Sequence, residues 1–355
     1  MTIYLFLLGL IGLPAALKIN PHTSPCSPQA SIKWISFALI LIIGLRHEVG
    51  GDWDPYILYM DSLRDQPFTS ILTTNEPGYL LLNWIGVNVW GGIYVVNILS
   101  AAIFVFGLNA FSRQQPRPNL AILISLPYLV VVVAMGYTRQ SVAIGLVMLG
   151  MAALYKKQLL RYVLWVIAAL FFHKTAAIML PFAFFALRKH RILVGLLMAL
   201  MFLLMAALLR EHASYYLNSY VNSDYESKGA TGRLLIIVIP AILFVISHRR
   251  FAIPQELKKY WLSMSWASFL LLILLTAFPE NSTAIDRIAL YWIPFEMMVL
   301  SHLPDVLAIR DVSKKFWLLM VVACSSQLLL IWLTFANHSM KWLPYQFFPW
   351  VWMWS

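Results

Sequence analysis

The chain has 355 residues, of which 61% are hydrophobic and only 12% are charged, and its mean hydropathy is +0.76. A soluble domain is about half apolar and about a quarter charged, so this composition excludes a water-soluble globular protein and indicates one surrounded by lipid. The net charge of +11 does not indicate a nucleic-acid-binding protein, because Lys and Arg occur in short clusters between apolar runs. Cys26 lies in a Pro/Ser loop and Cys324 in an apolar run, which argues against a disulfide framework or a metal site.

Apolar runs recur along the whole chain and predict an all-α protein with a single integral membrane domain over residues 1–355. The first run, residues 3–17, lacks a basic start and a clear cleavage site, so we interpret it as a first helix and not as a signal peptide. The other runs are 34–45, 79–111, 119–135, 140–155, 162–187, 192–209, 233–247, 260–278, 286–303 and 316–336.

Short basic segments between these runs favour the cytoplasmic side of a membrane. They are Lys18–Lys33, Arg113–Arg117, Lys156–Arg161, Arg188–Arg191, His248–Lys259 and Arg310–Lys315. All of them can face the cytoplasm only if 79–111 crosses once and 162–187 crosses twice. The sequence therefore predicts a transmembrane bundle of about 12 crossings, within a range of roughly 10–13, with both termini outside.

Two of the long runs are expected to be broken. A single helix over 162–187 would be about 39 Å long at 1.5 Å per residue, and would place the basic clusters at its two ends on opposite sides of the membrane. Two half-length helices that meet near His173–Lys174 avoid this. Because non-helical backbone at membrane depth is tolerated only inside protein or beside water, we expect His173 to line a cavity open to the external side of the membrane. In 79–111, Gly91–Gly92 predicts a break between an interfacial helix and a true span.

Two external loops follow from this topology, 46–78 and 210–232. The first is long and acidic, and the second is rich in tyrosine, with Tyr215, Tyr216, Tyr220 and Tyr225. Aromatic rings with a polar edge suit stacking against sugar rings.

Ionisable residues gather at the predicted external ends of helices. They are Arg46, Asp52, Arg139, His173, Lys174, Arg233, Asp286 and Arg287. Any single arginine near a helix end usually reaches towards lipid headgroups. Several external arginines together oppose the orientation preference of membrane proteins, so as a group they favour binding of an anionic ligand.

The segment from Arg46 to Tyr56 reads Arg-His-Glu-Val-Gly-Gly-Asp-Trp-Asp-Pro-Tyr. Its two glycines permit a tight turn that places Asp52 just above Arg46. This is either an ordinary loop with a local Arg–Asp pair, or a site in which Arg46 holds a phosphate and Asp52 accepts a hydroxyl proton. Asp54 could replace Asp52, and Tyr56 would form a wall of the site.

Glu76 and His173 each have two interpretations. Glu76 precedes Pro77 at a helix start, where a carboxylate complements the helix dipole, but it is equally placed for catalysis. His173 is either a buried hydrogen-bonding residue or a proton acceptor with a near-neutral pKa.

Arg139 and Arg287 each lie at the start of a predicted span, where a cation opposes the helix dipole. This unfavourable placement favours a bound anion beside them. Gln140 follows Arg139, and Tyr291 lies one turn deeper than Arg287 on the same helix face.

Taken in order, these motifs resemble the EpsG family of exopolysaccharide polymerases, a branch of the Wzy-like group. The resemblance extends over about residues 46–291. It rests on Arg46, Gly51-Asp52, Tyr56, Glu76-Pro77-x-Tyr79, Arg139-Gln140, Phe172-His173-x-Thr175-Ala176, Arg287 and Tyr291.

The resemblance implies a glycosyltransferase-type polymerase that joins undecaprenyl-pyrophosphate-linked oligosaccharide units at the periplasmic face of a bacterial inner membrane. Arg46, Arg139 and Arg287 would hold the pyrophosphate, and Asp52 or His173 would activate the acceptor hydroxyl. The remaining expected substrate-binding residues are Tyr56, Tyr79, Glu76, Gln140 and Tyr291. The expected partners are the lipid-linked substrate, membrane lipid, a flippase and a chain-length regulator. No cofactor, metal or nucleic acid is expected.

Three alternatives remain open at this point. A transporter or flippase of lipid-linked oligosaccharide should show internal repeats and unusual polar residues on both sides of the membrane. A membrane O-acyltransferase could use His173 as base but would need a route for an acyl donor. A structural partner in a polysaccharide complex would tolerate replacement of Arg46, Arg139 and His173.

Overall fold

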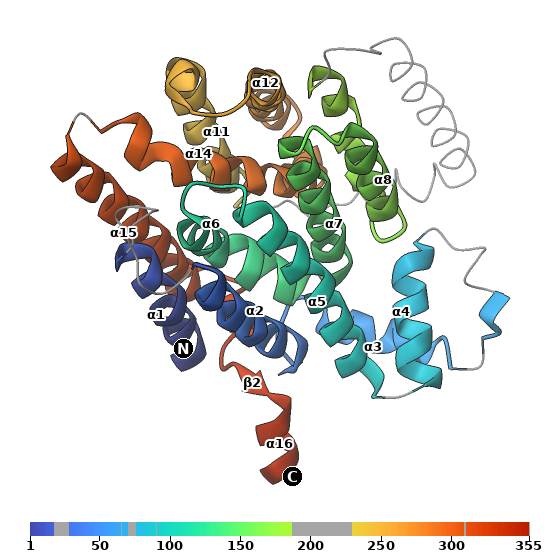
Figure 1. Cartoon of the computed structure of the whole chain (residues 1–355). Helices are drawn as coiled ribbons and strands as arrows, with labels where there is room; N and C mark the ends of the chain where they lie inside the picture. Colours follow the sequence, from blue (N-terminus) through green and yellow to red (C-terminus); the bar gives the residue numbers. More distant parts are fainter. Residues whose placement is uncertain are drawn as a thin grey trace.

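The computed structural model of the chain describes residues 1–17, 28–64, 66–69, 76–89, 91–186, 229–308 and 310–354. Helices form almost all of its regular structure (Figure 1). They are α1 (Thr2–Leu17), α2 (Pro28–Gly44), α3 (Trp53–Asp61), α4 (Pro77–Asn88), α5 (Gly92–Ser112), α6 (Pro118–Ser125), α7 (Thr138–Tyr155), α8 (Leu159–Leu170), α11 (Ala230–Ser247), α12 (Gln255–Ala277), α13 (Ser282–Ala289), α14 (Ile293–Val306), α15 (Asp311–Phe335) and α16 (Phe348–Trp354).

Other local structures complete these helices. A π-helical segment, η2 (Leu126–Ala134), continues α6, and the 3-10 helices η3 (Lys174–Met179) and η4 (Pro181–Ala186) follow α8. Short 3-10 turns lie at η6 (His248–Arg250), η7 (Pro279–Asn281), η8 (Leu290–Trp292) and η9 (Ser339–Lys341). Strands β1 (Arg46–His47) and β2 (Gln346–Phe347) pair antiparallel, with Arg46 opposite Phe347.

Five of the described helices are long and apolar enough to cross a membrane: α5, α7, α11 with η6, α12 and α15. The expectation of an all-α membrane protein is therefore confirmed. The count of about 12 crossings and the periplasmic cavity stay predictions, since the other described apolar helices are shorter. The predicted run 192–209, and the tyrosine-rich loop up to residue 228, lie outside the described residues.

Helix α7 lies at the centre of the bundle. Its membrane-length segment is 89% buried, against 28% for α15 at the edge. It packs against α5 at two glycines: a Cβ on Gly107 would lie 1.9 Å from the carbonyl oxygen of Gly145. Small residues let membrane helices approach at backbone distance, so this crossing fixes α7 against α5.

Both predicted breaks are confirmed. Helix α8 ends at Leu170, and His173 is extended (φ −158°, ψ 120°) before the 3-10 turns begin. Helices α4 and α5 are separated at Gly91, whose φ of +79° suits glycine.

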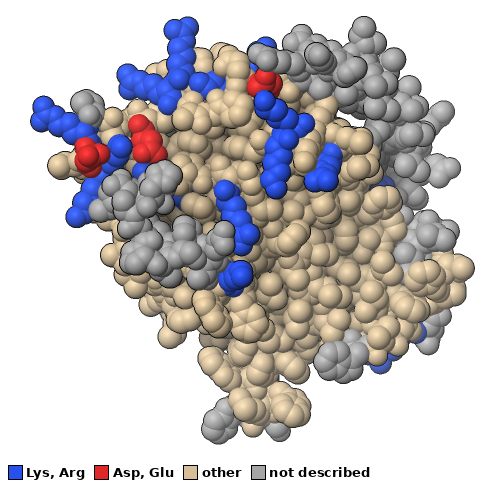
Figure 2. All heavy atoms as spheres, viewed as in Figure 1, with Lys and Arg blue, Asp and Glu red and all other residues tan. Residues whose placement is uncertain are grey.

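The two ends of the bundle differ in charge. One end of the bundle carries the connections α5–α6, α7–α8, α11–α12 and α14–α15, and we call it the basic end. Figure 2 shows Lys and Arg gathered over that upper part of the molecule. Both termini and the β1–β2 pair lie at the opposite end (Figure 1). These four connections lie together as the sequence predicts, whereas the expected basic segment Arg188–Arg191 and most of Lys18–Lys33 lie outside the described residues.

The close crossing of α5 and α7 makes a testable prediction. Replacing Gly107 with Ala forces the two backbones apart, and should lower the free energy of unfolding by about 1–3 kcal/mol. Thermal unfolding of the purified protein in detergent would measure this. Gly9→Ala in α1 is the matched control, because a Cβ there meets nothing within 4 Å. Equal midpoints for the two variants would contradict the proposed crossing.

Candidate active site

One carboxylate joins three distant segments at the end opposite the basic end. Glu76, just before α4, accepts a hydrogen bond of 2.7 Å from Arg139 Nη1 in the first turn of α7. Its other oxygen lies 2.9 Å from His173 Nδ1, at the break after α8. The Glu76 side chain makes no helix-capping hydrogen bond. Of the two roles that the sequence left open for this residue, its contacts therefore favour a place in the cluster.

The surroundings of Glu76 keep it ionised. Burial alone would raise the pKa of Glu76. The hydrogen bond from His173, the charge of His173 and that of Arg139 outweigh burial and lower this pKa below its ordinary value. The carboxylate is thus a permanent acceptor between two donors.

The contact with Glu76 also orients the imidazole of His173. With Nδ1–H donating to the carboxylate, a neutral ring carries its lone pair on Nε2. This Nε2 is buried and has no hydrogen-bond partner within the described part of the chain. The residue as a whole is only 4% exposed, so its free nitrogen does not face open solvent.

Asp52 and Arg287 form the more open side of the cluster. Burial raises the pKa of Asp52, and the charges of Arg287 and Arg139 only partly offset this effect. The Arg287 guanidinium carbon lies 4.8 Å from the centre of the Tyr137 ring. Gln140 Nε2 donates a 2.6 Å hydrogen bond to the backbone oxygen of Arg287, which ties the start of α7 to α13.

Tyrosines pack beside Arg139 and behind it. The Tyr56 ring centre is 6.0 Å from the Arg139 guanidinium carbon. Tyr79 is buried, and its ring lies 5.5 Å from that of Tyr56 and 6.4 Å from that of Tyr59. The buried Tyr291 accepts a 3.2 Å hydrogen bond from Thr175, two residues after His173.

Arg46 does not occupy the place that the sequence suggested. It is 1% exposed, and it donates hydrogen bonds to the backbone oxygens of Ile43 and Val49, to Asn97 Oδ1 and to Thr138 Oγ1. A guanidinium that is committed to buried protein acceptors is not available to a phosphate in this structure. We therefore correct the expected phosphate contact and assign Arg46 a structural role, in which it fixes the first residue of α7 beside Arg139.

A second arginine–carboxylate pair was not assigned a role from the sequence. Arg233 Nε and Nη2 donate to the two oxygens of Asp286 at 2.6 and 2.8 Å. The Arg233 guanidinium carbon also lies 5.9 Å from the centre of the Tyr128 ring. Both charged residues had been noted at external helix ends, but their separation along the chain gave no sign that they pair.

All segments that build this cluster lie within the span matched by a family model. The EpsG family model matches residues 33–347, which is most of the chain. The chain belongs to the EpsG family. Membership suggests a Wzy-like polysaccharide polymerase. No protein of curated function and no solved structure matches the chain.

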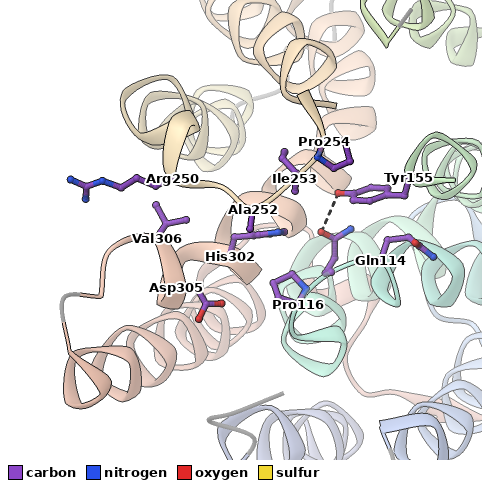
Figure 3. A pocket seen from close by; sticks show the side chains of 11 residues that line it. Gln114, Pro116, Tyr155, Arg250, Ala252, Ile253, Pro254, His302, Asp305 and Val306 are labelled. Atoms are coloured by element: carbon purple, nitrogen blue, oxygen red, sulfur yellow. Dashed lines mark hydrogen bonds between the residues drawn. The ribbon is translucent and has the colours of Figure 1, made fainter. Parts of the chain in front are cut away.

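A separate pocket of about 340 Å³ lies at the basic end (Figure 3). Gln114 and Tyr155 line one side of it, and Ile253, His302 and Asp305 line the other. Asp305 is paired with the buried Arg117. None of the cluster residues lines this pocket. We place the candidate active site at the cluster and not at the pocket. Within the described ranges, no three His, Cys, Asp or Glu side chains converge as metal ligands would.

The lowered pKa of Glu76 predicts a pH-dependent contribution to stability. That contribution is present above the unfolded-state pKa of about 4.3 and is lost as the pH falls through the lower folded-state pKa. A Glu76→Gln variant lacks this titration. The unfolding midpoint of Glu76→Gln should therefore lie furthest below that of the wild type near neutral pH, and this difference should shrink below about pH 4. Thermal unfolding across this range measures the deficit, with the exposed Glu280→Gln as control. A deficit that stays constant with pH would refute the ionic role.

Proposed function

We propose that this chain is a polymerase that joins oligosaccharide units carried on undecaprenyl pyrophosphate, at the periplasmic face of a bacterial inner membrane. The observation that carries the proposal is that the Asp52 carboxyl group lies near Arg139 and Arg287, whose charges both act on it, while Glu76 holds Arg139 at the same end of the bundle. By the positive-inside rule the basic end faces the cytoplasm, so the cluster would face the periplasm.

The arginines would hold the leaving group. Arg139 and Arg287 are each able to contact phosphate oxygens through two N–H groups. In the reaction, the bond between the donor sugar's anomeric carbon and the pyrophosphate breaks, and a new glycosidic bond forms to a hydroxyl of the acceptor unit. Undecaprenyl pyrophosphate leaves with the bonding electrons. The charge that develops on it is stabilised by fixed cations at a site partly shielded from water.

Asp52 is the favoured acceptor of the hydroxyl proton. Its carboxylate is only partly buried, and its raised pKa brings it closer to the working pH, which improves a general base. His173 is almost fully buried and bonded to Glu76. We therefore give the Glu76–His173 pair the role of orienting Arg139, which is 42% exposed and reaches the open side.

Comparison of three variants tests the assignment of the base. Asp52→Asn should lower turnover about 10²–10⁴-fold while donor binding is retained. His173→Ala should lower turnover less, because Glu76 still bonds to Arg139. The measurement is a gel ladder formed by purified protein with its lipid-linked repeat unit in vesicles.

Asp54→Asn is the matched control for this comparison, since the Asp54 side chain is 77% exposed and lies two residues away, in the first turn of α3. If Asp52→Asn turns over as fast as the wild type, the assignment of Asp52 as the base is wrong. Substrate that crosses the vesicle wall without forming a ladder would indicate a transporter, and would remove the polymerase proposal altogether.

The same assignment predicts a pH shift. Turnover at saturating donor requires ionised Asp52, so it should fall as the pH drops through the Asp52 pKa. The charge of Arg287 lowers this pKa, so Arg287→Gln should raise it and move the acidic limb of the pH–turnover curve to higher pH. Arg310→Gln, an exposed arginine at the basic end, is the control. If the acidic limb does not move in Arg287→Gln, the ionisation of Asp52 does not control turnover.

A further inference from the structure

The chain returns across the active-site end after α15. Residues 336–348, which we call the C-terminal strap, run beside β1 and the loop that leads to Asp52; Figure 1 shows β2 and α16 leaving the bundle there. The backbone N–H of Gly50 donates to the Lys341 oxygen at 2.9 Å, and that of Phe348 donates to Leu45 at 2.8 Å. Tyr345 donates through its hydroxyl to the Ile42 oxygen at 2.6 Å. The strap is therefore hydrogen-bonded along the whole Ile42–Gly50 segment.

Trp342 is the buried centre of this strap. It is 2% exposed, and its indole N–H donates to the backbone oxygen of Val131 at 2.8 Å. Its own backbone oxygen accepts a 2.8 Å hydrogen bond from the Tyr4 hydroxyl. One bond thus fixes the indole ring and the other fixes the backbone of the same residue.

The indole ring packs against two glycines that belong to different loops. A Cβ on Gly51 would lie 3.7 Å from the ring, and a Cβ on Gly136 would lie 2.5 Å from it, so only glycine fits at 136 without a shift. The loops also touch each other, because a Cβ on Gly50 would lie 2.2 Å from the Met135 oxygen. Gly50 has a φ of +113°, which favours glycine as well.

The two glycines lie just before the proposed reacting groups, one on the Asp52 loop and the other ahead of α7. Gly51 immediately precedes Asp52, and Gly136 lies three residues before Arg139. The indole ring of Trp342 therefore contacts both backbones. The separation of these backbones sets the distance between the Asp52 carboxylate and the Arg139 guanidinium. Among the described residues, no hydrogen bond or ion pair joins Trp342 to Asp52 or Arg139, so its effect on the reaction passes through the backbone beside the two glycines.

We propose that Trp342 is a positioning residue that holds the Asp52 loop at its working distance from Arg139, an inference that rests on the proposed function for its catalytic consequence. Arg139 is held independently by Glu76, so loss of the indole displaces Asp52 more than Arg139. Donor binding is retained and turnover falls. Asp52 also becomes better solvated, which removes part of the burial that raises its pKa.

The test compares Trp342→Ala, Trp342→Phe and Trp261→Ala, with turnover expressed per folded molecule. Trp342→Ala should lower turnover about 10²-fold with unchanged donor affinity, and should move the acidic limb to lower pH. Trp342→Phe keeps a ring between the glycines and should recover most of the loss. Trp261 is as fully buried but packs against Phe111 and Tyr260, away from the cluster, so its variant should lose stability without losing turnover per folded molecule.

Equal turnover per folded molecule in the two alanine variants would show that Trp342 is merely structural. Hydrogen exchange supplies a readout that does not depend on the reaction. Trp342→Ala should speed exchange of the Gly50 amide, which the strap protects, while Trp261→Ala leaves it unchanged. If the wild-type protein forms no ladder, the polymerase proposal fails. If the Gly50 amide exchanges as slowly in Trp342→Ala as in the wild type, the positioning proposal is wrong, whatever the outcome for the polymerase proposal.

Discussion

The active-site end depends on the carboxylate of Glu76. It bonds to Arg139 and His173 at once and so joins α4, α7 and the break after α8, which are far apart in the sequence. An arginine in the first turn of a helix opposes the helix dipole, and a partner carboxylate offsets that cost. Removal of Glu76 would leave a half-exposed cation and a buried imidazole without their acceptor, and the buried imidazole makes this more costly than loss of a surface ion pair. The geometry of the cluster therefore follows from this one group.

Ion pairs occupy part of the charge of the cluster. Arg139 is paired with Glu76 and Arg233 with Asp286, whereas Asp52 and Arg287 are near each other and form no close ion pair among the described residues. An anionic ligand can gain a cation at Arg287 without breaking an existing pair. At Arg139 it must share the guanidinium with Glu76, and the exposed part of that side chain makes sharing feasible.

Features that depend on local sequence could be predicted, and features that depend on pairing could not. Hydropathy and basic clusters identified the apolar helices and the breaks at Gly91 and His173, because both signals lie within a few residues of the feature they predict. The predicted topology also placed Asp52, Glu76 and Arg139 at the same side of the membrane. Arg46 was misassigned because its acceptors, such as Asn97 and Thr138, are ordinary polar residues inside apolar runs. The Arg233–Asp286 pair and the strap around Trp342 were missed because only three-dimensional packing selects such partners.

The two reacting sides of the site are held by different kinds of contact. Arg139 lies on α7, whose position is set by the backbone contact of Gly145 with Gly107 and by the buried bonds of Arg46 to Thr138. Asp52 lies on a loop that is fixed from outside, by the strap and by the glycine contacts of Gly50. Contacts between backbones in a packed core are stiff, whereas a loop held by one strap opens at lower cost. Arg139 thus lies on a closely packed helix and Asp52 on a more easily displaced loop, so under the proposed roles the holding of the donor is separated from the activation of the acceptor.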